Sequence, residues 1–201
     1  MERAAAMVRS LKANVTREEA LRHFTGGARG VAAAVLRGRA RSMAELYIPY
    51  RLFRVKIRNG GSEEKRVYAL DAVEGTLDLF EFLEMPVERE LVTVESRNAL
   101  SALLPAEQAR ERLMGKVRRG VFSRGFMRLR DLEMEAAVAD EFHVPYWVCF
   151  RGAGQAAKLE ILDAVRRRLE GGKVRELVER WLQASSMDSS TAEDGLEQAS
   201  P

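Results

Sequence analysis

LYIPYRLFRV, residues 46–55, returns in altered form as FHVPYWVCFR, residues 142–151. Both copies place Pro-Tyr between an apolar lead and a further apolar run. Two more blocks recur in the same order: TREEALRHF at 16–24 with PAEQARERL at 105–113, and VYALDAVEG at 67–75 with LEILDAVRR at 159–167. The copies of the three blocks lie 96, 89 and 92 residues apart, so we interpret the chain as two copies of one unit.

Each copy carries the signals of a helix followed by a hairpin. Thr16 and Glu19 have the spacing of a capping box, and Pro105 suits a first helical position, where no N–H is needed. The Pro-Tyr runs are rich in aromatic and β-branched residues and end at glycine-containing turns, RNGG at 58–61 and RGAG at 151–154. After VYAL and a turn at Glu74-Gly75, the alternation in TLDLFEF at 76–82 predicts a third strand.

The second copy is more ambiguous than the first. Residues 157–170 fit a helix or a strand, and the repeat favours the strand. VRELVERWL at 174–182 has apolar residues at amphipathic helical spacing, which predicts a helix that packs on a sheet. TGGARG at 25–30 lacks the Lys-Ser/Thr of a phosphate loop and is expected to separate two helices.

The predicted fold is therefore α+β, with two tandem units that each combine a helix with an antiparallel sheet. We expect a helical extension over 1–15, a first unit over 16–90 and a second unit with a C-terminal helix over 91–184. Residues 185–201 hold Asp188, Glu193, Asp194 and Glu197 without Lys or Arg, so they are expected to form a disordered acidic tail. The sequence does not decide whether the two sheets merge.

TREEA, a strand, a glycine turn and a strand ending in Asp-Ala-Val-x-Gly together resemble PepSY-like repeats. The resemblance covers 16–82 and, less closely, 105–182. It implies a cystatin-like arrangement of a helix across a small antiparallel sheet. It also implies inhibitory or protein-interaction roles rather than catalysis.

Composition limits the class of protein. The 201 residues with 46% apolar content suffice for one large or two small domains with a proper core. Cys149 is the single cysteine, which excludes an internal disulfide and fits a reducing compartment. The first twenty residues have scattered charges, and no run approaches the roughly 20 apolar residues that span a bilayer. We expect a soluble cytoplasmic protein without membrane contact.

The chemistry-bearing residues form no recognisable catalytic, cofactor or metal site. GAGQAA at 152–157 matches a dinucleotide fingerprint, but the following segment is helical where that fingerprint needs a second strand with an acid. Only His23 and His143 accompany Cys149, too few for a metal cluster or a convincing nucleophile with its base. Asp71 and Asp163 occur in both copies and are interpreted as caps of local turns. The protein is predicted not to be an enzyme and to need no cofactor.

Two surfaces are candidates for partner binding. Trp147 shares a strand face with His143, and that face is either covered by the terminal helix or exposed as a contact patch. With Trp147 and the matching residues of the other copy, the predicted protein-contact surface is Tyr50, Arg51, Tyr146 and Trp147. The leading hypothesis is accordingly a protein-interaction or regulatory module.

The alternative hypothesis is nucleic-acid binding, because net charge is +3 overall and +7 without the acidic tail. Its basic patch comprises Lys116, Arg118, Arg119, Arg124, Arg128 and Arg130. The tail would then compete with phosphate. A third hypothesis places a small-ligand site between the two sheets.

Overall fold

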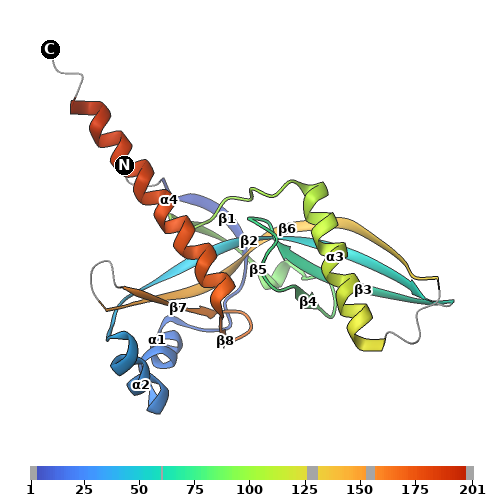
Figure 1. Cartoon of the computed structure of the whole chain (residues 1–201), viewed down its shortest axis with the longest axis horizontal. Helices are drawn as coiled ribbons and strands as arrows, with labels where there is room; N and C mark the ends of the chain where they lie inside the picture. The colour runs from blue at the N-terminus through green and yellow to red at the C-terminus, as the bar shows by residue number, and fades with distance from the viewer. Residues whose placement is uncertain (1–3, 60, 126–130, 153–156, 198–201) are drawn as a thin grey trace.

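A computed structural model describes residues 4–59, 61–125, 131–152 and 157–197, and leaves the side chains of Arg29, Arg124 and 185–197 undescribed. The fold is mixed α+β, as expected, with helices set around one curled sheet (Figure 1). The strand order is β4-β3-β2-β6-β1-β5, and β7 and β8 extend the sheet from β6. The two expected sheets therefore merge into one.

Two long strands form the centre of the sheet. β2 (Ala40–Asn59) and β6 (Glu133–Arg151) pair antiparallel along nearly their whole lengths, with Ile48 opposite Val144. These strands contain the two Pro-Tyr segments, whose aromatic and β-branched side chains suit a buried pleated surface. Both strands cross the molecule from end to end (Figure 1).

The two prolines lie inside these central strands, where a strand start, bulge or edge is the usual position. The carbonyl of Pro49 accepts from Ala72 N at 2.8 Å, and that of Pro145 from Ala164 N at 3.1 Å. Both acceptors face the point where a flanking strand has just ended. In a strand, the N and the carbonyl of one residue point to the same neighbouring strand. The N–H that each proline lacks would therefore have pointed to the side where the flanking strand has ended, so no hydrogen bond between β2 and β6 is lost.

Each central strand continues into a hairpin. β3 (Ser62–Asp71) follows β2 and pairs with the short β4 (Phe80–Phe82), while β7 (Lys158–Asp163) follows β6 and pairs with β8 (Arg168–Leu169). The strand interpretation of 157–170 is therefore correct.

The predicted turn caps are confirmed. Asp71 accepts from the backbone of Glu74, Gly75 and Leu77, and the carboxylate of Asp163 accepts from the backbone of Val165 and Arg166.

The N-terminal segment is a strand, so the helical extension predicted for 1–15 is wrong. β1 (Ala6–Leu11) pairs antiparallel with β5 (Leu91–Ser96), which follows the short 3-10 turn η1 (Glu88–Glu90), and meets β6 in parallel at Ser10 and His143. Pairing on both sides buries Val8, Ser10 and Leu11. The partners lie about 80 or more residues away, which a local helix propensity cannot register.

The helices α1 (Arg17–Thr25) and α3 (Ala106–Gly125) each cover the hairpin of the other half of the chain. Ala20 and Phe24 of α1 pack with Trp147, Cys149 and Leu162 of the β6–β7 hairpin. The residues of the matching cluster, on α3 and on β2–β3, are Ala109, Leu113, Val117, Phe53, Val55, Ile57, Tyr68 and Leu70. The capping box of Thr16 and Glu19 starts α1 as predicted.

The remaining helices differ in how they attach. α2 (Gly27–Arg37) follows α1 after Gly26, as the glycine-rich segment predicted. The predicted C-terminal helix is α4 (Gly172–Glu197), which packs on the sheet through Val174, Leu177 and Val178. It continues past Ala184 and projects from the body (Figure 1), so residues 185–197 are helical where disorder was expected. No proline interrupts this segment, and its first glycine is Gly195.

Candidate functional site

The predicted contact residues belong to the interior. Tyr50 and Tyr146 are fully buried, and their hydroxyl groups are 2.9 Å apart in a hydrogen bond. Trp147 is buried beneath the segment that precedes α1 and donates from Nε1 to the carbonyl of Val15 at 3.0 Å. The terminal helix does not provide this cover.

Arg51 is also held in place. It donates to the carbonyl of Leu104 at 2.9 Å and to Glu141 at 2.8 Å, and only 12% of its side chain is exposed. The four residues fix the sheet and its helices, so the expectation that they form an exposed contact surface is corrected.

The predicted basic patch is only partly assembled. Lys116 is half-buried and donates to the carbonyl of Leu77, and this burial lowers the pKa of its ammonium group. Arg118 and Arg119 are exposed on α3. The side chains of Arg124, Arg128 and Arg130 lie outside the described part of the chain. Within the described part, the patch therefore reduces to two exposed arginines.

A different exposed feature appears on α2. Residues at positions i, i+3, i+4, i+7 and i+8 of this helix are all apolar and all exposed, a pattern that normally faces a core. We name them the outer stripe: Ala28, Val31, Ala32, Val35 and Leu36. Val31, Val35 and Leu36 are 65%, 80% and 74% exposed. The side of α2 facing the protein carries the small residues Gly30, Ala33 and Ala34, followed by Arg37 at its end.

Glycines separate α2 from α1. A Cβ on Gly26 would lie 2.6 Å from the carbonyl oxygen of Arg22, and Gly27 adopts a φ of +64°, where side chains are rarely found. α1 therefore ends after nine residues, whereas α3 continues for twenty. After Gly26 the chain therefore leaves the β6–β7 hairpin, whereas α3 continues over the β2–β3 hairpin for its later turns.

A buried ion pair holds the C-terminal ends of both α1 and α2. Arg151 is 1% exposed and donates from Nε to Glu160 at 2.6 Å. Its other nitrogens donate to the carbonyl of Phe24, at the end of α1, and to that of Gly38, after α2. Arg37 adds a second ion pair to Glu160 at 2.8 Å. A guanidinium suits this position because the last carbonyls of a helix lack partners and carry partial negative charge.

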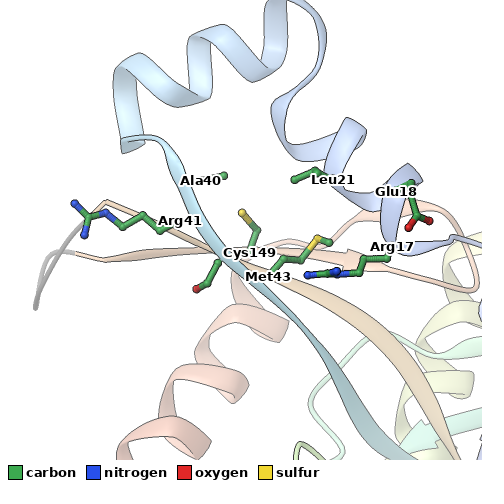
Figure 2. Close-up of a pocket in the computed structure, with 8 residues that line it drawn as sticks. Arg17, Glu18, Leu21, Ala40, Arg41, Met43 and Cys149 are labelled. Atoms are coloured by element: carbon green, nitrogen blue, oxygen red, sulfur yellow. The ribbon is translucent and has the colours of Figure 1, made fainter.

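A hollow of about 280 Å³ lies between α1 and the start of β2 (Figure 2). Met43, Cys149, Ala40 and Leu21 provide apolar walls, and Arg17, Glu18, Arg41 and Ser42 provide the polar groups. Arg17 extends toward Met43, whereas the guanidinium of Arg41 points away from Cys149 (Figure 2). Neither arginine forms an ion pair with another described residue.

Two titratable groups on β6, Cys149 in the hollow and His143 further along the strand, have pKa values shifted by burial. Burial raises the pKa of the Cys149 thiol, which keeps it mainly protonated near neutral pH and slows its reactions without preventing them. Burial lowers the pKa of His143, whose Nε2 lies 3.3 Å from the carbonyl of Leu100. Across the described residues, no group of three His, Cys, Asp or Glu side chains could hold a metal ion, and no helix could span a membrane.

Comparison with known proteins finds no match among family models, curated proteins or solved structures. The resemblance to PepSY-like repeats therefore stays a prediction. The outer stripe was readable in the sequence as the apolar spacing of GARGVAAAVLR, residues 27–37. Spacing alone indicates an apolar face, however, and does not tell whether that face is buried or exposed.

Proposed function

We propose that the protein is a non-enzymatic protein-interaction module built from two copies of a helix-plus-hairpin unit. The observation that carries the function is the outer stripe of α2. Contiguous apolar surface on a helix that the fold leaves uncovered is typical of a contact site for another protein. The proposed contact surface thus moves from the Pro-Tyr strands to α2.

The register of β2 and β6 supports the two-unit interpretation. Residues 96 apart in the chain, Ile48 and Val144, are direct cross-strand partners. Two positions further along each strand, Tyr50 and Tyr146 meet through their hydroxyl groups. Such self-pairing is what an approximate two-fold axis between two equivalent units would produce.

Contacts away from this axis also occur in matching pairs. Arg51 donates to the carbonyl of Leu104, and Trp147 donates to that of Val15. The two donors are again 96 residues apart. The two acceptors are 89 residues apart, which is also the offset between the helices that follow them. The parallel contact of Tyr47 with Ala99 matches that of His143 with Ser10. We infer that each unit lends its helix to the hairpin of the other.

The function is tested by comparing captured partners of three proteins: the wild type, a V31D/V35D variant and a Leu83→Asp control. Leu83 is fully exposed and belongs to neither α1 nor α2, so its change adds the same charge type elsewhere. We expect partners that bind the wild type and the control to be lost from V31D/V35D. The same partners on all three proteins would contradict the role of the stripe.

Nucleic-acid binding is the second candidate and rests on the exposure of Arg118 and Arg119. Fluorescence anisotropy with generic DNA and RNA tests it, using the full chain, residues 1–184 and an R118E/R119E variant. If phosphates are bound, affinity falls steeply with salt, rises without the acidic tail and is weakest in the arginine variant. No binding at low salt would remove this candidate.

A further inference from the structure

We infer that the hollow between α1 and β2 is a binding site for a short aliphatic anion, with a carboxylate or phosphate monoester as its head. The inference goes beyond the interaction surface, because the hollow is lined by residues outside the outer stripe. Part of its support is a comparison of the two halves and rests on the two-unit interpretation proposed above.

The hollow lies at a position where the two halves carry side chains of different size. In the first half, the position equivalent to Cys149 is Phe53, which is fully buried against Ala109 and Leu113 of α3. Over the β6–β7 hairpin of the second half, α1 places Ala20 and Phe24 at the matching positions. The residue beneath them is Cys149, which is smaller than Phe53. The packing that closes the first half is therefore incomplete in the second, and the space remains open.

The walls suit an aliphatic chain. Met43 lies directly opposite Cys149 across the β2–β6 ladder, so a thioether and a thiol form the floor. Leu21, which is 48% exposed, and Ala40 complete the apolar lining. Methionine adapts to irregular apolar shapes, and about 280 Å³ lies near the lower limit of small-ligand sites. A short chain is accordingly favoured over a long one.

The charges at the mouth suit an anion. Arg17 runs along the hollow toward Met43 (Figure 2) and has no ion-pair partner within the described part of the chain. Arg41 is exposed at the other side and can turn inward by side-chain rotation. Against these two cations stands a single acid, Glu18. A guanidinium binds carboxylate and phosphate oxygens by charge-assisted hydrogen bonds.

The direct experiment is calorimetric titration of the full chain with octanoate and octyl phosphate, next to octanol and octyltrimethylammonium. We expect both anions to bind, whereas the alcohol binds about tenfold or more weakly and the cation does not bind. Arg17→Glu should weaken the anions by about tenfold or more and leave octanol unchanged. Equal binding of octanol and octanoate would overturn the assignment of an anion site.

Two measurements localise the ligand. Cys149→Phe introduces the residue of the other half and should abolish binding while circular dichroism stays as in the wild type. Because overpacking can unfold a core, a second readout uses the single cysteine as reporter. Octanoate near saturation should slow methylthiolation of Cys149 about tenfold, because only the fraction of protein molecules without bound octanoate reacts. An unchanged rate places the ligand elsewhere and overturns the proposal.

The V31D/V35D variant separates this inference from the proposed function. It should bind octanoate like the wild type, because neither substituted residue lines the hollow. Loss of octanoate binding in this variant would show that the two surfaces are one site and would contradict the separate hollow. Loss of protein partners with intact octanoate binding supports both proposals independently.

Discussion

Tyr50 and Tyr146 illustrate how single residues hold the centre of the molecule. Each hydroxyl group is fully buried and has the other as its hydrogen-bond partner, at 2.9 Å. Burial raises the pKa of both side chains, so both are neutral throughout the physiological range. The Pro-Tyr segment thus provides internal polar contacts as well as apolar surface.

Removing one of these hydroxyl groups should destabilise the fold by more than half of the destabilisation caused by removing both. Tyr50→Phe leaves the Tyr146 hydroxyl buried without this partner, which is expected to destabilise the fold by about 1–3 kcal/mol. The Y50F/Y146F double variant should be less destabilised than the sum of the two single variants. Urea unfolding of the four proteins measures the coupling, and strict additivity would contradict a shared bond.

Tyr47 provides a pH dependence. Burial, with Glu45 as a second cause, raises its pKa to about 12, above the value near 10 of an unfolded chain. The tyrosine therefore stabilises the fold fully below pH 10, and this contribution is lost as pH rises toward 12. In urea unfolding between pH 8 and 12, Tyr47→Phe should lose less stability than the wild type above pH 10. Parallel curves for the two proteins would exclude this effect.

At the scale of elements, α1 and α3 start alike and end differently. Ala20 and Phe24 on α1, and Ala109 and Leu113 on α3, are all buried. Below the later turns of α3 lie Val55 and Tyr68, whereas the equivalent residues beside α1 are Arg151 and Glu160. An apolar pair supports a continuing helix, whereas the guanidinium of an ion pair donates hydrogen bonds to the carbonyls of a helix that has ended.

The ion pair should matter most when only one partner is removed. Arg151→Val strips Phe24 and Gly38 of their donor and leaves Glu160 with Arg37, so we expect a loss on the order of 3 kcal/mol in unfolding free energy. The R151V/E160Y variant installs the apolar pair of the other half and should be destabilised less. Chemical denaturation measures the unfolding free energy of both variants. A lower unfolding free energy for R151V/E160Y than for Arg151→Val would contradict this reasoning.

At the scale of the whole molecule, the halves do not form separate bodies. β2 pairs with β6 along the centre, and each hairpin is covered by a helix from the other half. The boundary expected near residue 90 therefore separates parts that depend on one another for their cores. Cooperative unfolding in a single transition follows from such an arrangement.

Fragments test this dependence. Residues 1–90 lack α3 and β6, and residues 91–184 lack α1 and β2, so neither fragment should fold alone. Mixing them should restore part of the circular dichroism of the full chain. A fragment with cooperative thermal unfolding of its own would show that the halves are independent domains.

The sequence by itself determined the local structure. The capping box at Thr16, the glycine-ended hairpins and the turn caps of Asp71 and Asp163 depend on residues a few positions apart, so their signals are complete in short windows. The internal similarity also placed the strand at 158–163, where helical spacing competed.

Only the tertiary structure decided what each element meets. The apolar spacing of α2 was visible, but its exposure results from the chain turning away after Gly26. β1 is a strand because β5 and β6 lie beside it, and Trp147 is buried because the segment before α1 crosses from the other half. Such choices depend on apolar area summed between segments far apart in the chain, which no local pattern contains.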